Sequence, residues 1–97
     1  MENKILLPIG TVVAVGNSET EEVAPIIIVG YAGQGTENRI YDYIGFLYPY
    51  GFEDREHVVV FNENRIKKVL YLGYKDKDYE ECIPGIMAMI DDARGGK

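Results

Sequence analysis

The sequence has no tryptophan, one cysteine and one histidine, and it contains no long hydrophobic run. One cysteine cannot form an internal disulfide or a CxxC pair, which excludes a dithiol redox motif and a zinc site built from thiols alone. The short apolar runs cannot span a bilayer, and Glu2 and Lys4 precede an apolar stretch that is too short for a signal peptide. We therefore expect a protein of the reducing cytoplasm that does not insert into membranes.

Basic residues are also few. The chain has 10 lysines and arginines against 16 aspartates and glutamates, which gives a net charge of −6. Nucleic-acid affinity depends mainly on clustered lysine and arginine, so we expect neither DNA nor RNA as a partner. Most of the excess negative charge falls in residues 1–54, where Lys4 and Arg39 are the only bases.

Glycine and proline divide the 97 residues into short extended segments, a pattern typical of a small antiparallel β domain. The segments with β-branched or alternating apolar residues are 11–15, 26–29, 39–48, 57–61 and 67–74. Residues 62–64, Asn-Glu-Asn, favour one helical turn before the last segment. These features predict a mainly β member of the α+β class, with a five-stranded SH3-like barrel over about residues 5–75. The chain is long enough for one domain, residues 1–97.

Glycine is expected to change the direction of the chain at two places. Residues 30–35, Gly-Tyr-Ala-Gly-Gln-Gly, follow a strand, and their glycines predict a hairpin turn. Gly45 lies inside the third strand, where a glycine often marks a bulge or a sharp bend. A bend there would help short strands curl into a small barrel.

After residue 75 the apolar residues recur at helical spacing, which predicts an amphipathic C-terminal helix over about residues 76–94. Its apolar stripe consists of Tyr79, Cys82, Ile83, Ile86, Met87 and Ile90. Pro84 lacks an amide hydrogen, so the helix is expected either to kink there or to restart with Pro84 in its first turn. Cys82 is expected to be a small buried side chain, and the acidic residues at the start of the helix are expected to form a solvated first turn rather than a calcium loop.

No catalytic arrangement stands out in the sequence. Cys82, His57 and Ser18 are each the one residue of their type, and no spacing brings them together as a nucleophile and a base. Residues 30–35 are not followed by the Gly-Lys-Ser/Thr and the helix of a phosphate loop. We therefore expect no enzyme, no catalytic, metal-binding or cofactor-binding residues, and no cofactor.

Tyrosine is abundant, with eight residues, four of them in residues 41–50. Tyrosine is amphipathic and enriched in binding surfaces, so we expect about half of these residues to fill the core and the rest to contact a partner. The helix stripe must be covered by this domain, which is the default, or by another chain, a second copy included. The expected partner-binding residues are Tyr43, Tyr48, Tyr50, Tyr79, Ile83, Ile86, Met87 and Ile90.

Three segments together resemble a known family: residues 6–13 (LLPIGTVV), 41–51 (YDYIGFLYPYG) and 61–74, which begin Phe-Asn and end Leu-Gly-Tyr. In order and spacing they are similar to a small domain-of-unknown-function family of Gram-positive bacteria, whose members are typically encoded beside LXG toxins and WXG-like helical proteins of type VII secretion. The likeness covers about residues 5–80, and residues 41–51 are its most specific part. It implies a cytosolic accessory role in forming a secretion-competent toxin complex, without catalysis or an active site.

We therefore expect a non-enzymatic cytosolic protein-binding accessory, an adaptor or chaperone for a type VII secreted LXG-type toxin or its small helical partners. One alternative is an immunity-type inhibitor that occludes a basic site of a toxin with its acidic N-terminal half. Another alternative is a small-ligand-binding barrel, which would need a concave polar pocket.

Overall fold

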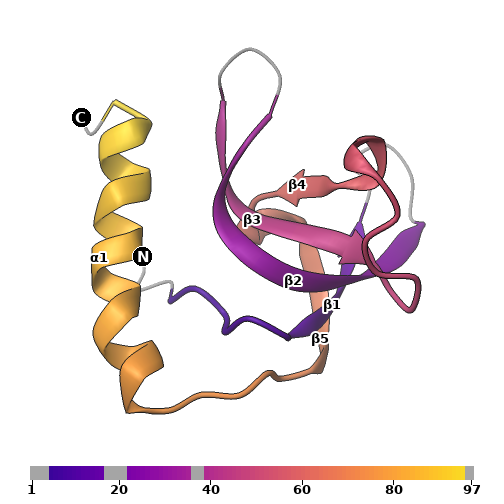
Figure 1. Cartoon of the computed structure of the whole chain (residues 1–97), viewed down its shortest axis with the longest axis horizontal. Helices are drawn as coiled ribbons and strands as arrows, with labels where there is room; N and C mark the ends of the chain where they lie inside the picture. The colour runs from indigo at the N-terminus through magenta and orange to yellow at the C-terminus, as the bar shows by residue number, and fades with distance from the viewer. Residues whose placement is uncertain (1–4, 17–21, 36–38, 96–97) are drawn as a thin grey trace.

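The computed structural model describes residues 5–16, 22–35 and 39–95. One antiparallel sheet is followed by one long helix (Figure 1). The strands are β1 (Val12–Gly16), β2 (Val23–Gln34), β3 (Ile40–Leu47), β4 (Val59–Phe61) and β5 (Ile66–Tyr71). The helix α1 spans Lys77–Ala93, and two 3₁₀ turns, η2 (Arg55–His57) and η3 (Glu63–Arg65), flank β4. The mainly β architecture of the α+β class, with a C-terminal helix, is therefore confirmed.

The sheet is strongly bent but open. Its strand order is β4-β3-β2-β1-β5, and every neighbouring pair is antiparallel. The long strand β2 curves through the sheet and pairs with both β1 and β3 (Figure 1). Within the described part of the chain, β4 and β5 are the two edges and do not pair with each other. A closed SH3-like barrel is therefore not confirmed.

β2 continues through the glycine-rich segment as far as Gln34, so the hairpin turn predicted at residues 30–35 is wrong. The glycine at position 33 serves close packing instead. A Cβ on Gly33 would lie 2.6 Å from Cγ1 of Ile44 and 2.7 Å from Cγ1 of Val60, so a larger residue would push the neighbouring strands away. The reversal comes later, where Gly35 donates its N–H to the carbonyl oxygen of Arg39 at 2.8 Å.

The irregularity predicted at Gly45 is confirmed, and it takes the form of a bulge on the paired strand. β2 shifts register between Ile28, which lies opposite Gly45, and Gly30, which lies opposite Ile44. A Cβ on Gly45 would lie 2.7 Å from the carbonyl oxygen of Ile27. The two strands approach closely here because no side chain separates them.

Some boundaries around β4 and β5 differ from the prediction. His57 does not begin a strand but ends η2, whose N-cap Asp54 accepts two backbone N–H bonds from the turn. β4 is correspondingly short, and β5 ends at Tyr71, before the predicted boundary. The helical turn predicted after Asn62 is confirmed as η3.

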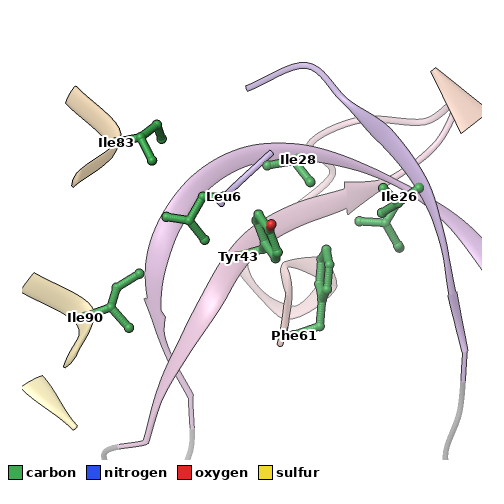
Figure 2. Packing of buried hydrophobic residues seen from close by; sticks show 8 residues of the cluster. Leu6, Ile26, Ile28, Tyr43, Phe61, Ile83 and Ile90 are labelled. Carbon is green, nitrogen blue, oxygen red and sulfur yellow. The ribbon is translucent and has the colours of Figure 1, made fainter. Parts of the chain in front are cut away.

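The hydrophobic core is centred on Tyr43 and Phe61, whose rings stack with their centroids 5.3 Å apart. Figure 2 shows Leu6, from the segment that precedes β1, between these rings and two isoleucines of α1, Ile83 and Ile90. All five side chains are buried. The default expectation is therefore confirmed: α1 docks on its own domain, partly through Leu6.

α1 is a single helix with Pro84 in its interior, so the proline does not restart the helix. The side chain of the N-cap Asp76 accepts the N–H of Tyr79 at 3.0 Å, and the acidic first turn is confirmed.

The predicted burial of Cys82 is wrong, because its side chain is exposed. The two buried residues of α1 are Ile83 and Ile90, which share one line along the helix, so the covered stripe is narrower than the sequence pattern.

Candidate functional site

Tyrosine hydroxyl groups hold the segment before β1, residues 5–11, between the helix and the sheet. Tyr79 of α1 donates to the carbonyl oxygen of Leu6 at 2.5 Å, and Tyr31 of β2 donates to the carbonyl oxygen of Leu7 at 2.6 Å. These backbone groups belong to no strand, so side chains satisfy them instead. Two elements that are distant in the sequence thereby fix the position of the segment.

Tyr43 of β3, at the centre of the core, also bonds to this segment through its hydroxyl group. Its hydroxyl accepts the N–H of Leu7 at 3.0 Å and donates to Oε1 of Glu63 at 2.6 Å. Burial raises the pKa of Tyr43, and the hydrogen bond to Glu63 raises it further. We refer to Tyr31, Tyr43 and Tyr79 as the tyrosine clamp.

The other two members of the clamp are also difficult to ionise. Burial raises the pKa of Tyr31 to about 12, and the neighbouring Tyr79 adds to the shift. The pKa of Tyr79 is itself raised by burial and by the charge of Glu80. All three hydroxyl groups stay protonated near neutral pH, so the clamp keeps its donors there.

The C-terminal end of α1 is fixed by Arg94. Its Nη2 donates to Oδ1 of Asp42 at 3.0 Å and to Oδ1 of Asn62 at 2.7 Å, and its Nε donates to the carbonyl oxygen of Ile40 at 3.1 Å. Asp42 also accepts the N–H of Glu63 at 2.8 Å. α1 is therefore attached by polar contacts near both of its ends.

Two apolar grooves flank the line along which α1 meets the N-terminal segment. Groove 1 has a volume of about 640 Å³. Its apolar lining is Ile5, Tyr79, Ile83, Pro84, Met87 and Ala88. Its charged residues are Lys75, Glu80 and Asp91. The α1 residues that line groove 1 lie mainly on one side of the buried stripe of the helix.

Groove 2 lies on the other side of the same stripe and has a volume of about 330 Å³. Its lining comes from the N-terminal segment, β2, the connection before α1, and the helix: Pro8, Ile9, Tyr31, Tyr74, Asp78, Tyr79, Cys82, Ile83 and Ile86. Only Asp78 among these residues carries a charge. The groove is therefore suited to apolar side chains.

Large apolar side chains are exposed in both grooves. Ile5 in groove 1 is 61% exposed, and Tyr74 in groove 2 is 79% exposed. Ile9, also in groove 2, is 48% exposed. Burial of such side chains against a partner contributes about 25 cal/mol for each Å² of apolar surface, so the grooves can supply binding energy.

The residues expected to bind a partner fall into three groups. Tyr79, Ile83, Ile86 and Met87 line the grooves. Tyr43 and Ile90 are buried, and Ile83, although it lines both grooves, is buried as well, so the chain itself covers most of these three side chains. Tyr48 and Tyr50 are exposed in the connection after β3 and line neither groove.

Sequence patterns did not identify Ile5, Ile9 and Tyr74 as groove residues. An alternation in the N-terminal segment could have identified the first two, because Leu6 and Pro8 are buried while Ile5 and Ile9 are exposed. Tyr74 lies outside every regular element, and no local pattern places it beside the helix.

The side chains considered for nucleophilic catalysis lie in different places. Cys82 lines groove 2, whereas His57 lines a separate pocket of about 460 Å³ beside the ends of β1 and β2. His57 Nδ1 lies 2.6 Å from Oδ1 of Asp54, and both side chains are exposed. Ser18 lies outside the described residues. In residues 5–16, 22–35 and 39–95, no three His, Cys, Asp or Glu side chains gather as metal ligands.

Comparison with known proteins gives one family. The family model described as "Domain of unknown function (DUF4176)" matches residues 6–82. No significant match is found among curated proteins or among solved structures. The match includes β1 to β5 and the first part of α1. It covers most of the lining of groove 2, whereas Ile5 and the helix residues of groove 1 from Ile83 onward lie outside it. Within the described residues, no helix is both long and apolar enough to cross a membrane.

Proposed function

The chain belongs to the DUF4176 family of domains of unknown function, and on this basis we propose that it is a non-enzymatic protein-binding accessory of the cytoplasm. Its docking surface is formed by grooves 1 and 2 beside α1. One observation carries the proposal: the linings of the two grooves are mostly apolar, and they include the exposed side chains of Ile5 and Tyr74.

A helix of the partner is the segment that these grooves suit best. The helix lining of groove 1 runs from Tyr79 to Asp91, which corresponds to a length of about 18 Å at the rise of an α-helix. A partner helix lying along α1 could place three apolar residues, one from each successive turn, into such a groove. Lys75 at one end and Asp91 at the other provide opposite charges that would favour one orientation.

The family resemblance supplies a partner for this surface. Members are typically encoded beside LXG toxins and WXG-like helical proteins of type VII secretion, so we propose that the partner helix belongs to such a toxin or to its small helical proteins. In this role the domain is an adaptor or chaperone that helps to form a secretion-competent complex. A soluble accessory of this kind needs no active site.

The proposal includes the finer architecture of the sheet. The order β4-β3-β2-β1-β5, a long β2 that pairs on both sides, and the turn η3 before the last strand are features expected of an SH3-like barrel. We propose that the domain is an open variant of that barrel. Its N-terminal segment and α1 extend the core beyond the sheet.

The two alternative functions have less support from the geometry. For an acidic inhibitor, two acids of the N-terminal half are already engaged, because Asp42 pairs with Arg94 and Asp54 bonds to His57. For a small-ligand barrel, the pocket beside β1 and β2 contains Arg65, whose Nε donates to a backbone carbonyl oxygen at 2.6 Å. We therefore favour the helix-docking role.

Co-purification tests the proposal. The tagged full chain is expressed with an LXG toxin and the small helical proteins that accompany such a toxin, and the complex is captured in low and in high salt. Ile5→Asp and Tyr74→Asp place a charge in groove 1 and groove 2, respectively, at exposed positions that tolerate it. Met89→Asp is the matched control, because Met89 is an exposed residue of α1 that lines neither groove.

The proposal predicts that the wild type and Met89→Asp capture the toxin complex in both salts and that the two groove variants lose it. Capture by both groove variants would reject the docking surface. Loss of capture by the wild type in high salt would favour the acidic inhibitor instead, because surface electrostatic attraction is screened by salt.

A further inference from the structure

A run of exposed apolar residues lies at the C-terminal end of β5 and just after it, and none of them lines groove 1 or groove 2. Its members, here called the β5 strip, are Val69 (42% exposed), Leu70 (50%), Tyr71 (66%) and Leu72 (46%). Because successive residues of a strand point to opposite faces, the β5 strip exposes apolar side chains on both sides of the sheet. Such runs on a surface are rare unless they serve binding.

The outer edge of β5 is also open for pairing. Among the described residues β5 pairs with β1 alone, whereas the other edge strand, β4, has three residues and buries Phe61. The N–H and C=O groups of an open edge form a template for another strand. β5 thus combines an edge of six residues with apolar side chains on both faces.

The charged residues around the β5 strip are all positive, whereas the whole chain has a net negative charge. Arg65, Lys67, Lys68 and Lys75 lie within residues 65–75 with no acidic residue among them, in a chain of net charge −6. All three lysines are exposed. Lysine at a strand edge discourages like-charged strands and attracts acidic ones.

We propose that the outer edge of β5 binds an extended acidic segment of a partner protein, which adds to the sheet as a sixth strand. Apolar residues of that segment lie against the β5 strip, and its acidic residues lie opposite Lys67 and Lys68 of β5. This surface goes beyond the helix-docking role, since strand addition uses backbone hydrogen bonds and needs neither groove.

A second copy of the chain is a poorer occupant than an acidic segment. Two β5 strands placed side by side would bring Lys67 and Lys68 of both copies to one edge, and β5 contains no acidic residue to offset them. Like charges directly opposite each other destabilise a strand pair. An acidic strand turns the same positions into favourable pairs.

Peptide binding to the ¹⁵N-labelled full chain tests the proposal. The probe is the capped peptide Glu-Glu-Val-Thr-Val-Thr-Glu-Glu, with two control peptides. One control replaces every Glu by Lys, and the other is N-methylated at alternate residues so that one edge cannot donate hydrogen bonds. The readouts are amide chemical shifts, hydrogen exchange of β5, and the sedimentation of the free chain.

The acidic peptide is expected to shift and protect amides of residues 66–72, and Lys67→Glu combined with Lys68→Glu, two exposed residues of β5 that line neither groove, should weaken its binding about tenfold. The matched variant Lys77→Glu, on α1, should change binding by less than about twofold. No effect at β5, or equal binding of the Lys or N-methylated peptide, would overturn the proposal. Dimers of the free chain that protect the same amides would replace the acidic segment by a second copy. None of these outcomes depends on the groove variants, so the two proposals fail separately.

Discussion

Arg94, just after α1, donates from Nη2 to Oδ1 of Asp42, near the start of β3, at 3.0 Å. The two residues are 52 positions apart in the sequence, and among the described residues Asp42 is the one charged residue that is buried. Their contact connects the end of the helix to the sheet, while the tyrosine clamp holds the N-terminal segment between them. Both attachments shape the grooves that we assign to partner binding.

Removing Arg94 should destabilise the domain measurably. In Arg94→Ala, Asp42 keeps the N–H of Glu63 but loses its cationic partner. Breaking a fully buried pair costs about 3–5 kcal/mol, and because the Arg94 side chain is 38% exposed we expect about 1–2 kcal/mol in urea unfolding. Lys77→Ala, which removes an exposed pair with Glu81, should change stability by less than about 0.5 kcal/mol. Equal effects of the two variants would contradict the structural role of Arg94.

Tyr43→Phe should test the tyrosine clamp. The substitution keeps the buried ring but leaves the N–H of Leu7 and a carboxylate oxygen of Glu63 without this partner. We expect a loss of about 1–3 kcal/mol in unfolding free energy and faster amide hydrogen exchange at Leu7. Tyr50→Phe is the control, because Tyr50 is 67% exposed. Unchanged exchange at Leu7 would show that the hydroxyl group does not hold the segment.

Two glycine-to-alanine substitutions should change stability in opposite directions. A Cβ on Gly45 would lie 2.7 Å from the carbonyl oxygen of Ile27, so Gly45→Ala should destabilise by about 1–3 kcal/mol. Gly85 lies in α1 with no atom near such a Cβ, so Gly85→Ala should stabilise by about 0.5–1 kcal/mol. Thermal unfolding of the two variants makes the comparison, and a tolerated Gly45→Ala would contradict the close strand approach.

The single histidine should titrate above its ordinary pKa. The hydrogen bond and charge of Asp54 raise the pKa of His57 above 6.5, and the bond to His57 lowers the pKa of Asp54 below 3.8. The stabilisation from His57 is complete below pH 6.5 and is lost as pH rises through its folded pKa. The contribution of Asp54 is complete above pH 3.8 and is lost as pH falls, so the pair acts fully between these values.

An NMR titration of the His57 ring measures this directly. Asp54→Asn keeps an oxygen that can cap η2 but removes the charge, so the pKa of His57 should fall back toward 6.5. Because both side chains are exposed, we expect only a small change in stability. An identical pKa in the wild type and the variant would mean that Asp54 does not hold the ring in solution.

Local sequence patterns correctly predicted the elements that depend on residues close together in the sequence. The turn after Asn62, the C-terminal helix and the irregularity at Gly45 follow from short-range chemistry, and all three are present. The extension of β2 to Gln34 could not be predicted in this way. Gly33 is required there by Ile44 and Val60, which are distant in the sequence, so a local reading assigns it to a turn.

The candidate site was predictable only in part for a similar reason. The helical spacing identified the groove residues of α1, but it could not show that the helix contacts a narrow segment around Leu6, which leaves Cys82 exposed. Nor could it separate tyrosines by role. Tyr31, Tyr43 and Tyr79 hold the chain together through their hydroxyl groups, and Tyr74 opens into a groove, although all four have the same chemistry.

The most direct test of the docking surface uses Cys82, the one cysteine, which is exposed and lines groove 2. The rate of its alkylation by N-ethylmaleimide is measured in the free native chain and in the chain with an excess of the helical region of the LXG toxin. Our account predicts rapid reaction of the free chain without denaturant, and reaction at least about tenfold slower when the toxin is far above its Kd. An unchanged rate in a complex shown to have formed, or no complex at all, would contradict the account.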